Sequence, residues 1–236
     1  MNKIQKVKIY PYGQSHKIPY KEEKISIVVG FDKNGNPIRE EFTDVKFDSL
    51  PATTLIQLSG GIDSTYVLWK WLLENPDDYC LVHHITFNYN NNEDARTEKQ
   101  LQSVDNILRW FDSQGLDNYF YLQNEFDYGN FTSIIYDVEI CGFLSGVILR
   151  SPRWSNIDTI ILPIYNKLSN REERRRMVTN ITSKKDMNFI YPLSGISKDQ
   201  VMESMPNELL SLCWYCRSPI DGMKCGECHS CKDVSD

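Results

Sequence analysis

The chain has 236 residues, of which 41% are hydrophobic, so it can bury one substantial core. Its formal net charge of −6 argues against capture of bulk duplex nucleic acid, which normally requires a basic surface. The longest apolar stretches are too short to cross a bilayer, and the first residues lack the apolar core of a signal peptide. We therefore expect a cytoplasmic protein without a membrane partner.

Residues 1–50 differ in pattern from the rest of the chain. Ile25, Ile27 and Val29 alternate with other residues, the turn-rich segment DKNGNP follows, and the chain resumes as IREEF. This arrangement predicts a β-hairpin. We expect a small β appendage over residues 1–50, a main domain over 51–210 and a cysteine-rich tail over 211–236.

From Thr53 onward, predicted strands alternate with predicted helices. The apolar patterns place strands at residues 53–58, 80–87, 119–126, 158–164 and 187–193, and helices at 93–111, at 143–150 and after Ser197. This alternation predicts an α/β fold with a doubly wound parallel sheet. Such sheets bind ligands beyond the carboxyl ends of their strands, where the segment LSGGIDST of residues 58–65 begins.

The segment LSGGIDST has the residues that a phosphate site needs. Its two glycines permit a sharp turn and a close approach of the backbone to a ligand. The free N–H groups of the following helix favour an anion, to which the hydroxyls of Ser59, Ser64 and Thr65 can donate. Asp63 is suited to holding Mg²⁺ or orienting the loop. A capped helix after a tight turn is the alternative, but the ordered string in this context favours phosphate binding.

The string is neither a Walker motif nor the G-x-G-x-x-G fingerprint. It resembles the pyrophosphatase loop (PP-loop) of the ATP pyrophosphatase superfamily, whose members split ATP between its α and β phosphates and transfer AMP to an oxygen of the substrate. The resemblance implies a Rossmann-like sheet of the adenine nucleotide alpha hydrolase type that binds ATP and Mg²⁺. The loop residues that it assigns to the nucleotide are Leu58, Ser59, Gly60, Gly61, Ile62, Asp63, Ser64 and Thr65.

Five of the seven cysteines lie in the last 24 residues: Cys213, Cys216, Cys225, Cys228 and Cys231. Because cytosolic thiols stay reduced, this clustering favours a metal site over disulfides. The C-x-x-C-x-x-C spacing of the last three brings thiolates to one metal, and either upstream cysteine can complete a tetrahedral structural zinc site. A set of redox or sulfur-carrying thiols is the alternative.

Two further features have a simple structural interpretation. Cys80 and Cys141 sit in apolar runs, where we expect them to pack in the core. The segment of residues 171–176 reads REERRR, and its mixture of arginines and glutamates favours a solvated helical face, although a mobile arm that closes over ATP phosphates is the functional alternative.

Loop and tail together resemble the QueC family of 7-cyano-7-deazaguanine synthases. In that family the second zinc cysteine follows the first by nine positions, as Cys225 follows Cys216 but not Cys213. The implied zinc ligands are Cys216, Cys225, Cys228 and Cys231. Cys213 is then a neighbour of the site, and we expect His229 to face solvent rather than to replace a thiolate.

Two further segments are similar to the same family. Tyr89, Asn90 and Asn91 occupy the place of a tyrosine-glycine-glutamine segment, which assigns Tyr89 to the nucleotide site. Lys198 corresponds to a lysine before a helix and is a candidate for contacting phosphate or a substrate carboxylate. A plain surface lysine is the alternative.

One departure from the family lies in the middle of the chain. Glu139 and Ile140 stand where the family has an arginine-asparagine pair, shortly before the FLS segment of residues 143–145. The resemblance covers residues 53–236 and is weakest in this middle part, where substrate choice is decided.

The resemblance implies an ATP-dependent carbon–nitrogen ligase with Asp63, Ser64 and Lys198 as catalytic residues. The enzyme adenylates the carboxylate of 7-carboxy-7-deazaguanine, ammonia attacks to give the amide, and a second activation gives 7-cyano-7-deazaguanine. One alternative is a QueC-like phage-defence enzyme that joins the activated acid to a protein amine. The others are a tRNA thiolation enzyme and a non-enzymatic AMP-binding sensor. The oligomeric state stays open, with a homodimer among the possibilities.

Overall fold

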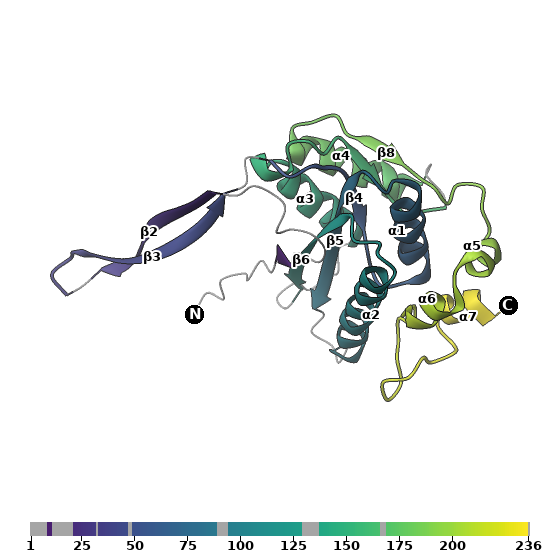
Figure 1. Ribbon diagram of the computed structural model, residues 1–236. Coiled ribbons are helices and arrows are strands. Elements are labelled where there is room, and N and C mark those ends of the chain that lie inside the picture. The colour runs from purple at the N-terminus through teal and green to yellow at the C-terminus, as the bar shows by residue number, and fades with distance from the viewer. Residues whose placement is uncertain are drawn as a thin grey trace.

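A six-stranded sheet forms the centre of the computed structural model, which describes residues 9–10, 21–31, 33–46, 49–88, 94–128, 137–165 and 169–235 (Figure 1). In the order β1-β6-β5-β4-β7-β8, its strands are β1 (Ile9–Tyr10), β6 (Tyr119–Asp127), β5 (Tyr79–Asn88), β4 (Ala52–Gln57), β7 (Thr159–Ile161) and β8 (Asn188–Ile190). The last five run parallel, whereas β1 pairs antiparallel with β6. The predicted α/β fold with a parallel sheet is confirmed.

Helices cover both faces of this sheet. They are α1 (Ile62–Glu74), α2 (Asp94–Ser113), α3 (Asp137–Leu149), α4 (Asn170–Ser183), α5 (Lys198–Ser204), α6 (Asn207–Leu212) and α7 (His229–Ser235). Successive strand residues point to opposite faces, so Ile56 packs in the core beneath α1 and α2, and Leu55 packs in the core beneath α3. A short 3-10 helix, Pro152–Trp154, packs in the same core as Leu55, on the α3 side of the sheet.

The strand order creates a crevice between two neighbouring strands. β5 and β6 lie on one side of β4, and β7 and β8 lie on the other. The helix after β4 belongs to the first core, whereas the helix after β7, α4, packs on α3 over the opposite face. The connections that follow β4 and β7 therefore diverge, which is the arrangement in which α/β sheets bind their ligands.

The predicted N-terminal β-hairpin is also confirmed. β2 (Lys21–Phe31) pairs antiparallel with β3 (Pro37–Lys46), with an irregular register between Val28 and Gly30. Figure 1 shows this hairpin, in purple and dark blue, projecting away from the main sheet. The sequence did not predict β1, which comes from the same region yet pairs with β6.

Several expected boundaries differ from the structure. The strands expected at 158–164 and 187–193 are shorter, because Pro163 and Pro192 lack the N–H that a ladder requires. The helix expected at 143–150 begins at Asp137, where an acidic first turn suits a helix N-terminus. Within the described ranges, no helix is both long and apolar enough to cross a membrane.

The expected solvated face of the arginine run is wrong for part of α4. Glu172 is 2% exposed and Arg175 is 9% exposed, because this side of α4 packs on α3. The helices approach closely at Gly142, where an added Cβ would lie 2.9 Å from the Arg175 carbonyl oxygen. Arg174 pairs with Glu139 of α3 at 2.5 Å, so these two residues form an interhelical ion pair.

Candidate active site

The loop between β4 and α1 adopts a conformation that requires glycine. Gly60 has φ of +80°, and an added Cβ would lie 3.2 Å from the Gln100 carbonyl oxygen and from the Ser103 hydroxyl. The loop therefore presses directly on α2. The N–H of Trp214 donates to the Gly60 carbonyl oxygen at 2.8 Å, which fastens the C-terminal tail to the same turn.

Two of the predicted phosphate-binding hydroxyls are used inside the loop. Ser64 is 2% exposed, and its hydroxyl accepts from the Ser59 N–H and donates to the Gly61 carbonyl oxygen, both at 3.1 Å. Thr65 is fully buried and donates to the same carbonyl oxygen at 2.8 Å. These side chains hold the turn, and of the three hydroxyl residues only Ser59 lines the cavity in front of it.

The N-terminus of α1 is open toward that cavity. Gly61 is its N-cap residue and has no side chain to cover the helix end, and Gly61, Ile62 and Asp63 line the cavity. Backbone N–H groups in a first helical turn have no partner within the helix, and the helix dipole is positive there. Loop and helix together form a surface suited to phosphate oxygens.

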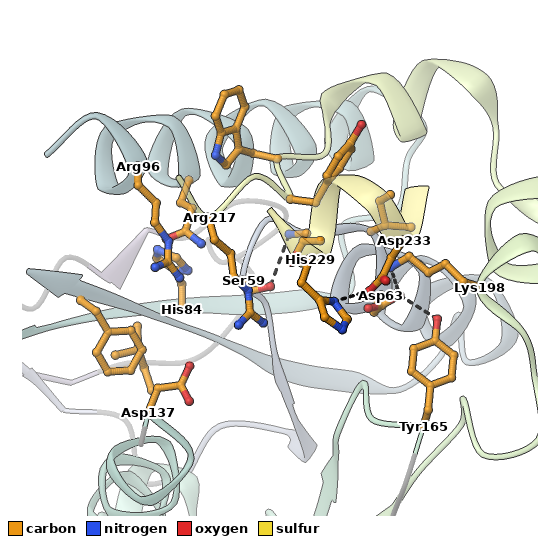
Figure 2. A pocket seen from close by; sticks show the side chains of 18 of the residues that line it. Ser59, Asp63, His84, Arg96, Asp137, Tyr165, Lys198, Arg217, His229 and Asp233 are labelled. Atoms are coloured by element: carbon orange, nitrogen blue, oxygen red, sulfur yellow. Dashed lines mark hydrogen bonds and ion pairs between the residues drawn. The ribbon is translucent and has the colours of Figure 1, made fainter. Parts of the chain in front are cut away.

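Asp63 of α1 contacts one residue of α5 and one residue of the segment after β7. Its Oδ1 lies 2.5 Å from Lys198 Nζ and accepts a hydrogen bond from the Tyr165 hydroxyl at 2.8 Å (Figure 2). Lys198 begins α5, whose start is fixed by a capping box between Ser197 and Gln200, and its side chain is 25% exposed. Burial, and after it the Asp63 charge, raises the pKa of Tyr165 above its usual range, so this hydroxyl stays a neutral donor.

The cavity has a volume of about 860 Å³ and lies beyond the carboxyl ends of β4 and β5. Phe87, Trp214 and Tyr215 supply flat apolar surface, and cations come from α2, α5 and the tail. The three basic residues that line it are Arg96, Lys198 and Arg217. Four aspartates, Asp63, Asp137, Asp199 and Asp233, also line it, so positive and negative charges lie side by side in the cavity, and the carboxylates suit a divalent cation.

The tail holds a four-cysteine cluster that fits a metal ion. The sulfur atoms of Cys216, Cys225, Cys228 and Cys231 all lie within 4.8 Å of one another. A tetrahedral site with metal–sulfur bonds of about 2.3 Å has edges of about 3.8 Å. Cys225 Sγ lies 3.6 Å from Cys216 Sγ and 4.0 Å from Cys231 Sγ, close to that edge. Backbone N–H groups, that of Cys228 first, lower the pKa of Cys225, which favours the thiolate that a metal needs.

Cys213 and His229, the other candidate ligands of the tail, lie outside this cluster. Cys213 is 2% exposed and lies outside the cluster, with its thiol 3.5 Å from the Leu209 carbonyl oxygen. His229 is also outside it; its side chain is 86% exposed and pairs with Asp233 at 2.8 Å. Cys80 is buried in the core as expected, but Cys141 is only partly buried.

The cluster also shapes the cavity. The N–H of Arg217 donates to Cys228 Sγ at 3.5 Å, and α7, which carries His229, Ser230 and Asp233, begins directly after Cys228. The residues Arg217, His229, Ser230 and Asp233 all line the cavity. One wall of the site is therefore built by the tail.

Comparison with known proteins assigns no family: no family model matches the chain, and no curated protein matches it. The structure brings Asp63 and Lys198 together, places Ser64 and Thr65 inside the loop, and describes nothing of Tyr89, Asn90 and Asn91, which lie outside the described residues. Sequence reasoning missed Tyr165, Arg217 and His84.

Proposed function

We propose that the protein transfers AMP from ATP to a carboxylate and passes the resulting acyl group to an amine. One observation carries the proposal: Asp63, at the open N-terminus of α1, meets Lys198 and Tyr165 in the crevice between β4 and β7. The order S-G-G-x-D-S and this placement together favour a PP-loop site over a Walker site.

Charge placement supports ATP as the donor of AMP. Backbone N–H groups of the loop and the Ser59 hydroxyl can bind the terminal phosphates, and Lys198 adds a positive charge. Asp63 is the residue that would hold Mg²⁺, which when bound supplies neutralisation of the pyrophosphate. These groups stabilise negative charge that develops on the leaving pyrophosphate, so their contribution is mainly positioning and electrostatics.

The proposed reaction consists of two displacement steps. A carboxylate oxygen attacks the α-phosphorus, and the bond to the bridging oxygen breaks to release pyrophosphate. A neutral amine then attacks the acyl carbon, loses a proton, and expels AMP. The resemblance of loop and tail to QueC favours 7-carboxy-7-deazaguanine as the acid, and the flat residues Phe87 and Trp214 in the cavity are compatible with a planar ring.

Ammonia is the simplest acceptor, and it would give the amide and, after a second activation, the nitrile. A protein amine is the second candidate, favoured by the hairpin of β2 and β3 that projects from the sheet and offers a place to dock a partner. We propose zinc as the metal of the four-cysteine cluster, with a structural role.

The thiols outside the four-cysteine cluster do not support the alternative function, tRNA thiolation. Burial raises the pKa of Cys213 to about 11, and it also raises the pKa of Cys141, although part of that residue is exposed. A sulfur-carrying cysteine works as a thiolate, so these surroundings disfavour that role.

The direct test is a pyrophosphate-release assay with ATP, Mg²⁺ and a panel of acids, followed by mass spectrometry of the products. We expect release with 7-carboxy-7-deazaguanine, and nitrile when ammonia is present. A reaction that stops at the amide, or that needs a protein acceptor, would favour the second candidate. If none of the acids in the panel leads to pyrophosphate release, the acid-activating function is contradicted.

A further inference from the structure

His84 is a buried side chain at the edge of the cavity with only one of its two ring nitrogens bonded. It is 2% exposed, and its Nδ1 lies 2.7 Å from the Leu58 carbonyl oxygen. Nε2 has no hydrogen-bond partner among the described residues, although His84 lines the cavity. Figure 2 shows it on the side of the cavity where Arg96 and Arg217 lie.

The hydrogen bond to Leu58 determines which nitrogen carries the proton. A carbonyl oxygen only accepts, so Nδ1 must donate. Burial lowers the pKa of His84 to about 4, so the ring is neutral near pH 7. A neutral ring with its hydrogen on Nδ1 has a lone pair on Nε2. His84 therefore places at the cavity wall a buried hydrogen-bond acceptor that has no donor among the described residues.

The surroundings of this acceptor define the chemistry of its partner. A lone pair on neutral nitrogen selects an N–H or O–H donor. Flat apolar surface that suits an aromatic ring comes from Trp214, which lines the same cavity. Arg96 and Arg217 favour an anionic group. The ligand that satisfies all three demands is a heteroaromatic anion with an amino or ring N–H group.

We propose that His84 Nε2 accepts a hydrogen bond from an amino or ring N–H group of such a ligand and thereby selects it. Under the proposed function, on which the ligand identities rest, the donor is the adenine amino group of ATP or an N–H group of the acid substrate. Nε2 has almost no accessible surface of its own, so binding requires a side chain to rotate at the cavity wall.

A matched pair of substitutions tests the acceptor in the full-length, metal-loaded protein. In His84→Asn, the amide nitrogen can replace Nδ1 as donor to Leu58, but no atom replaces Nε2. In His84→Gln, the amide oxygen can reach the place of Nε2 and accept. His83→Asn is the control, because His83 is equally buried but bonds Asn124 at 3.0 Å and does not line the cavity.

Binding is measured by calorimetry with three probes: the non-hydrolysable α,β-methylene ATP, its analogue with purine in place of adenine, and 7-carboxy-7-deazaguanine. We expect His84→Asn to weaken binding of one amino-bearing probe by about tenfold to a hundredfold, and His84→Gln to recover part of the loss. If ATP supplies the donor, the wild type discriminates against the purine analogue and His84→Asn does not. If the acid supplies it, only the affinity for the acid falls.

The outcomes separate this inference from the proposed function. Unchanged affinity of His84→Asn for both amino-bearing probes, with circular dichroism showing a folded protein, overturns the role of His84 even if pyrophosphate is released. Binding that depends on His84 without any pyrophosphate release overturns the function and leaves the subsite standing. A wild type that binds none of the probes overturns both.

Discussion

At the residue scale, Asp63 is the centre of the site because it satisfies two constraints at once. It belongs to the first turn of α1, where its carboxylate stands beside backbone N–H groups that attract anions. It also accepts from Tyr165 and pairs with Lys198, which come from different connections of the sheet. A carboxylate that only capped a helix would need neither contact.

Asp63→Asn removes the charge of this group while keeping its size. We expect kcat/KM for pyrophosphate release to fall by about a hundredfold or more, because the carboxylate no longer balances Lys198 or binds Mg²⁺. Asp77→Asn makes the same charge change at an exposed position that does not line the cavity, and it should leave the rate unchanged. Equal rates for the wild type and Asp63→Asn would contradict the proposed role of the carboxylate.

At the element scale, β5 carries two adjacent histidines whose side chains point to opposite faces. His83 bonds Asn124 of β6, and His84 bonds the Leu58 carbonyl oxygen at the start of the loop. Both are almost completely buried, and burial lowers the pKa of each from 6.5 to about 4. The two histidines of β5 therefore make the free energy of unfolding depend on pH.

The direction of that dependence follows from proton binding. The unfolded chain binds these protons below about pH 6.5, whereas the folded chain binds them only near pH 4. The free energy of unfolding should thus fall as the pH drops from 6.5 toward 4, by up to about 1.4 kcal/mol per pH unit for each histidine.

His83→Asn removes one of these titrations without touching the cavity. Urea unfolding at several pH values between about 7.5 and 5.5 should show a shallower slope for this variant than for the wild type. For each protein, the free energy of unfolding near pH 7.5 serves as the reference, so that only the slopes against pH are compared. Identical slopes would show that folding does not lower the pKa of His83.

The sequence predicted the local features of the fold and site better than the long-range ones. Strand and helix periodicity located the parallel sheet, and LSGGIDST located Asp63, because both depend on neighbouring residues. Tyr165 escaped prediction because its partner Asp63 lies 102 positions away. The pair His83 and His84 was visible in the sequence, but which of them faces the cavity depends on strand pairing. Burial of Arg175 likewise depends on the contact of α4 with Gly142.

At the scale of the whole molecule, the cysteine cluster connects the tail to the chemistry. The backbone of Trp214, two residues before Cys216, bonds the Gly60 carbonyl oxygen, and Arg217 directly follows that cysteine. A bound metal would thus hold both the outer wall of the cavity and one contact to the loop between β4 and α1. Loss of the metal should loosen the site from a distance.

Metal analysis of single-cysteine variants tests this connection. The wild type should contain about one zinc ion per chain, Cys216→Ser should lose it, and Cys213→Ala should retain it, because only Cys216 belongs to the cluster. Thermal melting should fall in Cys216→Ser, since metal binding contributes directly to folding of such tails, and pyrophosphate release should fall with it. Zinc retained in Cys216→Ser but lost in Cys213→Ala would assign the fourth ligand to Cys213 and contradict the arrangement of the tail.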